Sequence, residues 1–441
     1  MGPERRRRLA SIVLAAAAAA IAVGCSDDPQ PFRIGVIVDC VGINRSLQDG
    51  ELSGAELPLI ERGARLRGAL ATSGITATEV GGRPVELVPG CTEVYEFSTL
   101  TAEIRRLVEV EQVDAIVAGG GGADEVVVGR IARRYPDVVF VPVVHGPREV
   151  TLRSPPDNLF RFAGDHGQGV AGLGTYAYRQ LGWRTAAVVL SNWDAGWGSR
   201  DAFAAEFCSL GGEIKSQLAL DSFDPAGADV ADVPPDVDGV AVFAAQLFDP
   251  AGFLRELASR YESPARHIVV GPPITDAPAL LRSTRRALAG VAGSSYADPA
   301  RMRDYLRAHA RAFPGTPTDV AGSELVTGYR DAVEGLLVGL ENAGGSPSRL
   351  QEELARVRVG LLGGPVRLDD DGQAVESTSL VRIAPPGAGA PGLARLQTIR
   401  GVDQSVGGLL PRSLTPSDRP ARCDPGRRPP PWARAISRSD P

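Results

Sequence analysis

The stretch Arg33-Ile34-Gly35-Val36-Ile37-Val38 is apolar almost without interruption and opens a long alternation of short apolar runs and helical patterns. A run of this kind is typical of a strand that is buried on both faces of a parallel sheet. The strands expected after it are 85–88, 115–118 and 138–144, and the helices between them are 57–71, 99–110 and 123–134. This order predicts a parallel sheet that is covered by helices on both faces.

The same pattern starts again at Leu159-Phe160-Arg161-Phe162. Strands are expected at 186–190, 240–244, 267–270 and 290–294, with helices at 167–180, 199–209 and 249–260. Helices at 299–312, 319–342 and 347–357 follow, and then a hairpin at 363–373 that pairs with 380–383. We therefore expect an α/β protein with two doubly wound, flavodoxin-like lobes.

The first residues carry the pattern of an export signal. Four arginines at 5–8 precede an apolar stretch, 9–24, that is shorter than the roughly 20 residues of a membrane-spanning helix. Ala22-Val23-Gly24-Cys25 resembles the lipobox of bacterial lipoproteins, which implies cleavage before an acylated Cys25 and a short tether at 26–31. We expect an exported protein that its lipid anchors to the membrane, in the periplasm or on the outer face of the cytoplasmic membrane. A signal peptide that is cut elsewhere, or an uncleaved anchor, is the alternative.

Composition and motifs argue against several classes of function. The chain of 441 residues has a net charge of −6 with both signs interspersed, so no basic face points to nucleic acid. The sequence contains no Gly-x-Ser-x-Gly elbow, no HExxH, and no GxGxxG after the first strand. Its cysteines and histidines have no metal-ligand spacing. We expect no catalysis, no cofactor and no metal.

Four cysteines remain after the lipobox, namely Cys40, Cys91, Cys208 and Cys423. An even number of cysteines in an exported chain permits two disulfides. Cys40 and Cys91 follow the first two strands, which are neighbours in a flavodoxin-like order, so their ends lie within bridging distance. This favours Cys40–Cys91 and leaves Cys208–Cys423, with free buried thiols as the alternative.

The loops at the carboxyl ends of the strands are where open parallel sheets bind ligands. The residues predicted there are Gly120, Gly121, Gly122, His145, Trp193, Asp194, Gln246 and Tyr296. The glycine run is either an anion site at a helix N-terminus or a plain tight turn. Trp193 either walls the pocket or packs on its helix, and Asp194 either holds a ligand ammonium or caps that helix. For His145 a ligand contact and a structural role are both open, and for Tyr296 a ligand contact and a hinge role.

Three stretches carry a family resemblance. They are Asn158 to Phe162, Ser191 to Gly198, and Gly328 to Val333 with the later Gly339 to Gly344 and Gly364 to Asp369. Their order resembles the type I periplasmic binding proteins, in the branched-chain amino-acid branch of ABC transporters, over 32–383. The resemblance implies three crossings between a first lobe of 32–157 plus 297–363 and a second lobe of 158–296 plus 364–409. Hinge closure around a ligand is the expected motion. The Pro- and Arg-rich tail, 410–441, is expected to be mostly disordered apart from Cys423.

The resemblance implies that the protein captures a small polar ligand, an amino acid or a related compound, for an ABC permease and its ATPase. Two alternatives remain open. One is a nucleoside-binding lipoprotein of the basic-membrane-protein type, to which 113–140 has a local similarity. The other is a regulatory lipoprotein without a transport role, similar to the activators of penicillin-binding proteins.

Overall fold

A computed structural model describes residues 30–221, 229–244, 250–412 and 423–436. The predicted signal segment, Cys25, most of the tether and Gln246 lie outside these residues. Residues from Phe32 onward form one compact unit. Among the helices that the structure describes, none is long and apolar enough to cross a membrane.

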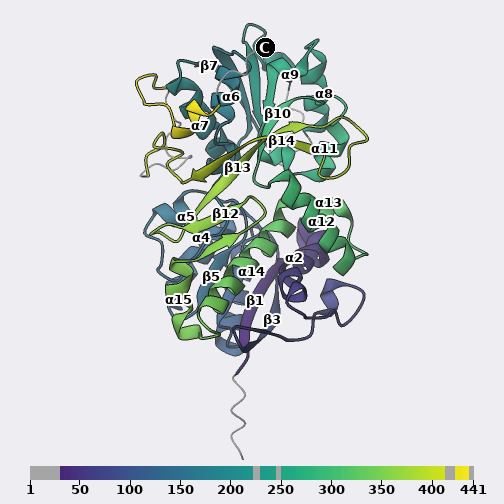
Figure 1. Cartoon of the computed structure of the whole chain (residues 1–441), viewed down its shortest axis with the longest axis vertical. Coiled ribbons are helices and arrows are strands. Elements are labelled where there is room, and N and C mark those ends of the chain that lie inside the picture. Colours follow the sequence, from purple (N-terminus) through teal and green to yellow (C-terminus); the bar gives the residue numbers. More distant parts are fainter. Residues whose placement is uncertain (1–29, 222–228, 245–249, 413–422, 437–441) are drawn as a thin grey trace, which may run out of the picture. The chain divides into compact units, whose positions relative to one another are not determined.

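The first sheet contains the opening strand at its centre (Figure 1). Its strands are β1 (Phe32–Asp39), β2 (Thr78–Val80), β3 (Arg83–Thr92), β4 (Ala115–Ala118) and β5 (Val139–Pro142). Their order is β2-β3-β1-β4-β5, and all neighbours are parallel except β2 and β3. Val36 of β1 packs in one hydrophobic cluster and the adjacent Ile37 in another. The strand is therefore buried on both faces, which is why its sequence is continuously apolar.

The helices of this lobe come from two separate parts of the chain. They are α2 (Gln48–Glu61), α3 (Phe97–Arg105), α4 (Gly122–Ala132), α5 (Glu149–Leu152), α12 (Pro299–Ala312), α13 (Thr318–Ala321), α14 (Glu324–Asn342) and α15 (Pro347–Ala355). Shorter turns are η1 (Gly42–Leu47), η2 (Ala71–Ser73) and the π-helical η3 (Arg106–Val110). Leu336 and Leu340 of α14 pack in the same cluster as Val36, so the late helices complete the first lobe.

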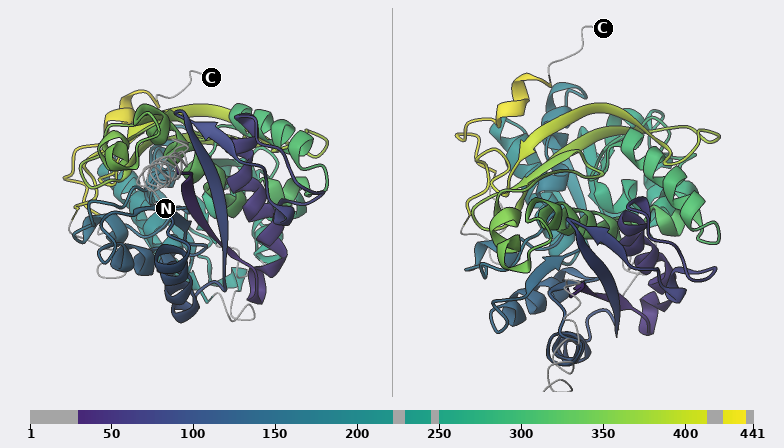
Figure 2. Two further views of the ribbon diagram at one scale, coloured as in Figure 1. Left: turned by 90° about the horizontal axis from the view of Figure 1, so that it is seen from below. Right: turned by 60° about the horizontal axis from the view of Figure 1, so that its bottom comes forward.

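The second sheet has the order β11-β12-β13-β10-β9-β8-β6-β7, and β14 pairs with β13. Its strands are β6 (Thr185–Ser191), β7 (Glu213–Leu220), β8 (Gly239–Phe243), β9 (Ile268–Val270), β10 (Ala292–Ser295), β11 (Arg358–Gly360), β12 (Pro365–Leu368), β13 (Ala374–Ile383) and β14 (Leu393–Val402). β6 to β10 are parallel, whereas β13 runs antiparallel to both β10 and β14. Figure 2 shows β13 and β14 as two long adjacent strands.

Helices cover both faces of this sheet as well. They are α6 (Leu173–Arg179), α7 (Asp194–Ser209), α8 (Ala251–Ser259), α9 (Pro264–His267), α10 (Pro272–Thr275) and α11 (Pro278–Thr284), with the turns η4 (Gln168–Val170), η6 (Val230–Asp232) and η7 (Pro431–Arg434). Val188 and Val189 of β6 pack in different hydrophobic clusters. The prediction of two α/β lobes with buried parallel strands is thus confirmed.

The chain passes between the lobes at three places. Phe162 packs in the first lobe and Val170 in the second, and the chain returns near Ala297, which again packs in the first lobe. Ala374, at the start of β13, packs with the first lobe, whereas Leu380 packs with the second. The hairpin of β11 and β12 therefore packs on the first lobe, although we assigned residues from 364 onward to the second.

Several elements differ from the sequence-based expectations. The helix expected at 57–71 is α2, which begins earlier, at Gln48, where Gly50 and Gly54 pack tightly against Val320 and Val326, and which ends at Glu61, before Gly63 with its positive φ of 106°. β7 and β14 were not predicted. Exposed and half-buried residues alternate along β7, so its sequence has no continuous apolar run. The expected pairing of the hairpin with 380–383 is wrong, because those residues pair with β10 and β14.

Both predicted disulfides are present in the structure. Cys40–Cys91 joins the ends of β1 and β3, with the Cα atoms 5.4 Å apart. Cys208–Cys423 links α7 to the tail, with the Cα atoms 5.1 Å apart. Beyond Cys423 the described tail packs on the second lobe, where Trp432 Nε1 donates to the buried Glu206 carboxylate at 2.8 Å. Residues 423–436 are thus held in place where we expected disorder.

The contact between α2 and α14 gives a direct stability test. A methyl group at Gly54 would lie 2.2 Å from the backbone oxygen of Val326, so Gly54→Ala should force the helices apart and lower the free energy of unfolding by about 1–3 kcal/mol. Gly252 in α8 is the matched control, since an added Cβ there meets nothing within 4 Å. Gly252→Ala should stabilise by up to about 1 kcal/mol. Urea denaturation measures both, and equal effects of the two substitutions would contradict the close packing.

Candidate functional site

A cavity of about 210 Å³ lies at the carboxyl ends of the strands and takes its walls from both lobes. From the first lobe it is lined by Asn44, Tyr95, Gly120, Gly121, Gly122, Val144, His145 and Glu324, among others. From the second lobe and the crossing between the lobes it is lined by His166, Trp193, Ala195, Pro273 and Tyr296. This position agrees with the rule that ligands bind beyond the carboxyl ends of parallel strands.

Most of the residues predicted from the sequence meet at this cavity. The three glycines follow β4, His145 follows β5, Trp193 follows β6 and Tyr296 follows β10. Asp194 comes from the second lobe to the edge of the glycine run, where a Cβ on Gly122 would lie 2.5 Å from its Oδ2 atom. Gln246 is outside the described residues. That these side chains contact a ligand stays a prediction.

His145 lies at the centre of a buried polar cluster between the lobes. Its ring stacks on Tyr296, with centroids 3.3 Å apart and planes 11° apart. Its Nδ1 lies 3.3 Å from Glu324 Oε1, and its Nε2 lies 3.7 Å from Glu376 Oε2. Burial alone would lower the pKa of His145, but the hydrogen bonds and charges of the two carboxylates outweigh it and raise the pKa to about 10. The ring is therefore a cation at neutral pH.

Tyr296 is fixed from the other side by Asp276, which follows β9. The carboxylate of Asp276 accepts from the Tyr296 backbone N–H at 2.9 Å and from the Ser295 hydroxyl at 2.5 Å. Burial nevertheless raises the pKa of Asp276 to about 7. The stacked rings of His145 and Tyr296 thus join the two lobes. The charge of His145 also affects the pKa of Asp276, which holds Tyr296.

Tyr95, Glu324 and His166 are among the cavity residues that were not predicted as ligand contacts. Tyr95 has a left-handed backbone (φ 66°) and donates its N–H to Asp124 at 3.2 Å. Its position in the loop after β3 could have indicated from the sequence that Tyr95 lies at the carboxyl ends of the strands. Glu324 opens α14, far along the chain, and nothing in its sequence context marks it. His166 follows Asp165, which accepts from the Gln168 N–H at 2.8 Å.

A network of buried hydrogen bonds supports the cavity wall from behind. The guanidinium of Arg161, 0% exposed, donates to Glu125 at 3.1 Å and to Gln373 at 2.6 Å. Glu125 also accepts from the backbone N–H of Val144 at 3.0 Å, beside His145. A methyl group on Gly146 would lie 2.0 Å from Glu125 Oε2, so only glycine fits there.

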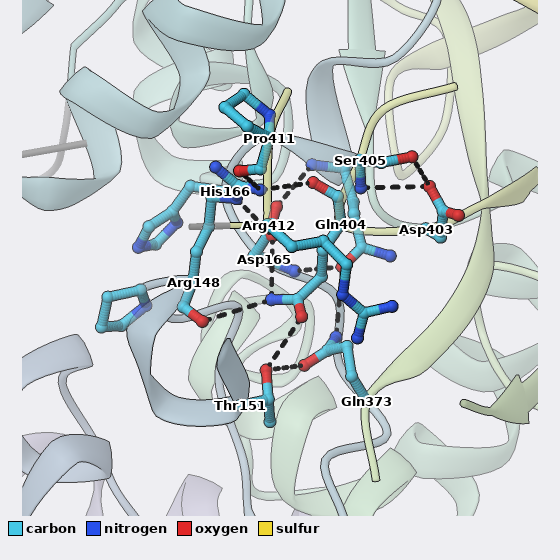
Figure 3. Close-up of polar contacts among 12 residues, drawn as sticks. Arg148, Thr151, Asp165, His166, Gln373, Asp403, Gln404, Ser405, Pro411 and Arg412 are labelled. Carbon is cyan, nitrogen blue, oxygen red and sulfur yellow. Dashed lines mark hydrogen bonds and ion pairs between the residues drawn. The ribbon is translucent and has the colours of Figure 1, made fainter. Parts of the chain in front are cut away.

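The network continues to the C-terminal segment, as Figure 3 shows. Arg148 donates to the backbone oxygen of Gln404 at 2.9 Å and to that of Pro411 at 3.1 Å. The side chain of Gln404 accepts from Thr151 at 3.1 Å and donates to Asp165 at 3.2 Å. The segment after β14 therefore bridges the first lobe and the loop that carries His166.

Two α/β lobes, three crossings and a cavity between the lobes define a bilobal ligand-binding class. A family model described as periplasmic binding protein matches residues 31–390, and the chain belongs to this family. The match confirms the resemblance to the type I, branched-chain amino-acid branch. Members of the family are extracytoplasmic solute-binding proteins.

Solved structures with the same fold share little sequence with this chain. An ABC transporter substrate-binding protein from Sphaerobacter thermophilus is 20% identical, with a TM-score of 0.72 over 85% of this chain and 99% of its own. The leucine-binding protein LivK from Thermotoga maritima is 20% identical, with a TM-score of 0.64 over 83% and 98%. A solute-binding protein from R. palustris in complex with benzoate is 18% identical, with a TM-score of 0.63 over 84% and 97%. A comparison with proteins of curated function finds no significant match.

The buried ion pair of Arg161 predicts a large loss of stability on substitution. Arg161→Met should lower the free energy of unfolding by about 3–5 kcal/mol at about pH 8, because it leaves the Glu125 carboxylate buried without its partner. Adding Glu125→Gln should recover part of this loss. Arg307→Met is the control, since the Arg307–Asp304 pair is exposed and should contribute less than about 1 kcal/mol. Equal losses for Arg161→Met and Arg307→Met in urea denaturation would refute the role of the network.

His145 predicts a pH dependence. Its folded pKa of about 10 exceeds the ordinary 6.5, so its protonated form stabilises fully below about pH 6.5, and this stabilisation is lost as pH rises through 10. The difference in unfolding free energy between wild type and His145→Asn should shrink by about 4 kcal/mol from about pH 6 to about pH 10. The titratable groups that interact with the ring are the carboxylates of Glu324, Glu376, Asp276, Glu125 and Asp331 and the neutral side chains of His166 and Tyr296.

The control for this titration is His309→Asn. Burial lowers the pKa of His309 to about 4, so that ring stays neutral across the whole range. Because the unfolded ring still titrates near 6.5, its difference from wild type should rise by less than about 1 kcal/mol above pH 6 and then stay flat, which is opposite in sign to the change for His145→Asn. A flat difference for His145→Asn would mean that His145 is not held as a cation.

Proposed function

We propose that the protein is a lipid-anchored solute-binding protein that holds a small polar ligand, an amino acid or a related compound, between its lobes. The observation that carries the proposal is the cavity at the strand ends, whose walls come from both lobes and from the crossing at Tyr296. A ligand in this position contacts both lobes at once, so its binding favours the closed arrangement. The chain would then deliver the ligand to an ABC permease and its ATPase.

Two polar atoms of residues that line the cavity support a ligand there. The indole Nε1 of Trp193 and the Nε2 of His166 are buried, and neither has a hydrogen-bond partner among the described residues. Buried polar groups in native proteins almost always have partners, and an atom without one needs an explanation. A polar ligand between Trp193 and His166 would supply the missing hydrogen bonds.

The proposal includes a membrane anchor at Cys25, which the sequence pattern at 22–25 supports. It also includes an ABC importer as the partner, which the family supports. Structures with this fold bind leucine, isoleucine or benzoate according to their descriptions. At identities of 20% or less these ligands do not transfer to this chain. The ligand has to be argued from the cavity itself.

The test is a ligand screen on a soluble form of the protein that begins at Ser26 and lacks the lipid-bearing Cys25. Amino acids, nucleosides and small carboxylates are added while the melting temperature and the tryptophan fluorescence are followed. A ligand at 100 times its Kd should add about 2.7 kcal/mol of stability. Trp193→Phe should remove the fluorescence change and weaken binding about tenfold, because it removes an indole N–H that is unpaired among the described residues and belongs to a residue that lines the cavity.

Trp197→Phe is the matched control. Trp197 lies one helical turn away, donates to Asn192 at 3.2 Å and packs on the core of the second lobe. This variant should bind like wild type. Unchanged binding by Trp193→Phe would place the ligand elsewhere. No stabilisation by any compound class would favour the regulatory lipoprotein.

A further inference from the structure

The charge of the cavity wall restricts what it can hold. The described residues that line the cavity include no arginine and no lysine, whereas Glu324 presents a carboxylate to it. The imidazolium of His145 is already matched by Glu324 and Glu376. A ligand carboxylate would therefore find no free cationic side chain among these residues.

The glycine run does not supply an open anion site either. Gly122 begins α4, and the N-terminus of a helix attracts anions. In this structure the position beside Gly122 is taken by Asp194 of the second lobe, whose Oδ2 atom would lie 2.5 Å from a Cβ at Gly122. A ligand carboxylate placed there would meet a carboxylate of the protein.

His166 is an independent sign of a ligand at the same place. Its side chain is about nine-tenths buried, with a relative exposure of 9%, and it lines the cavity. Its Nε2 has no hydrogen-bond partner among the described residues and lies 4.0 Å from Asp194 Oδ2. Burial lowers the pKa of His166, so the ring is neutral at neutral pH and its Nε2 can accept a hydrogen bond. A ligand group with two N–H donors, placed between His166 and Asp194, would donate a hydrogen bond to each of them.

Two aromatic rings complete the environment. Tyr95 is held in a strained left-handed conformation, and its ring packs on Gly121, where an added Cβ would lie 2.7 Å from it. Trp193 lines the opposite lobe of the same cavity. The faces of tyrosine and tryptophan attract organic cations. Aromatic rings next to carboxylates, with no cationic side chain among the described lining residues other than the His145 ring that Glu324 and Glu376 already neutralise, favour a positively charged ligand.

We propose that the ligand is a small organic cation whose ammonium or guanidinium group lies among Asp194, His166 and Glu324. A hydrogen-bond acceptor on the same ligand faces the indole N–H of Trp193. This inference rests on the proposed solute-binding function and narrows its ligand to compounds of net positive charge. A cavity with this preference would not bind an aromatic acid, which carries a negative charge.

The experiment is isothermal titration calorimetry of the mature protein with matched pairs of compounds. L-lysine and L-norleucine differ in the terminal ammonium, as do L-ornithine and L-norvaline, and L-lysinamide removes the carboxylate. Benzoate represents the aromatic acids. At least one of the three cations should bind ten or more times tighter than its uncharged counterpart, and higher salt should weaken it. Benzoate should not bind.

Substitutions of single carboxylates test whether Asp194 binds the charged group of the ligand. Asp194→Asn should weaken the cation tenfold or more while the melting temperature of the free protein stays within a few degrees. Asp304→Asn, on an exposed helix face, should leave binding unchanged. Tighter binding of norleucine, norvaline or benzoate would overturn the cationic class and leave the solute-binding function standing. No binding by any compound in this set or in the wider screen would overturn both.

Discussion

The fully buried guanidinium of Arg161 is the constraint on which the cavity wall depends. Removing this charge from water is costly, and the cost is offset only if its N–H groups find good acceptors. The acceptors are Glu125, Gln373, Thr151 and the backbone oxygen of Pro147. These groups belong to α4, the start of β13, α5 and the loop after β5, so one side chain fixes the relative positions of segments that are far apart in the sequence.

The same constraint reaches the cavity through Glu125. Its second oxygen accepts from Val144, and its position requires glycine at 146, so the loop that carries His145 has little freedom. His145 then stacks on Tyr296, which Asp276 holds from the second lobe. A change of charge at any of these groups alters the energy of bringing the lobes together, because each is buried when the lobes are close. Binding and protonation are therefore expected to be linked in this protein.

The sequence predicts the interior of this fold better than its edges. β1, β4, β6 and β8 are buried on both faces, so their apolar runs are unbroken and easily found. β7 is largely exposed along one face, and its alternating sequence carries a weaker signal. The described part of the tail, 423–436, is ordered beyond the expected attachment at Cys423. Its composition is that of a disordered segment, but a disulfide at Cys423 and the burial of Ile436 are enough to hold it.

Prediction of the candidate site succeeded where a single rule applied. The ends of parallel strands meet at one edge of a sheet, and this rule found the glycine run, His145, Trp193 and Tyr296. It could not find Glu324, because α14 reaches the cavity by packing on α2 rather than by following a strand of the first sheet. It also could not show that His166 would be buried without a hydrogen-bond partner, which depends on how close the second lobe comes.

The glycine run shows how the two lobes share the task of recognition. A side chain at Gly120 would lie 2.9 Å from Asp39, one at Gly121 would contact Tyr95, and one at Gly122 would meet Asp194. At the glycine run the first lobe therefore offers only backbone atoms to a ligand. The side chains that could distinguish one ligand from another belong to the loops around the run. Asp194 and Trp193 approach only when the second lobe is close. Selection of the ligand by charge would thus involve both lobes, through Glu324 of the first lobe and Asp194 of the second.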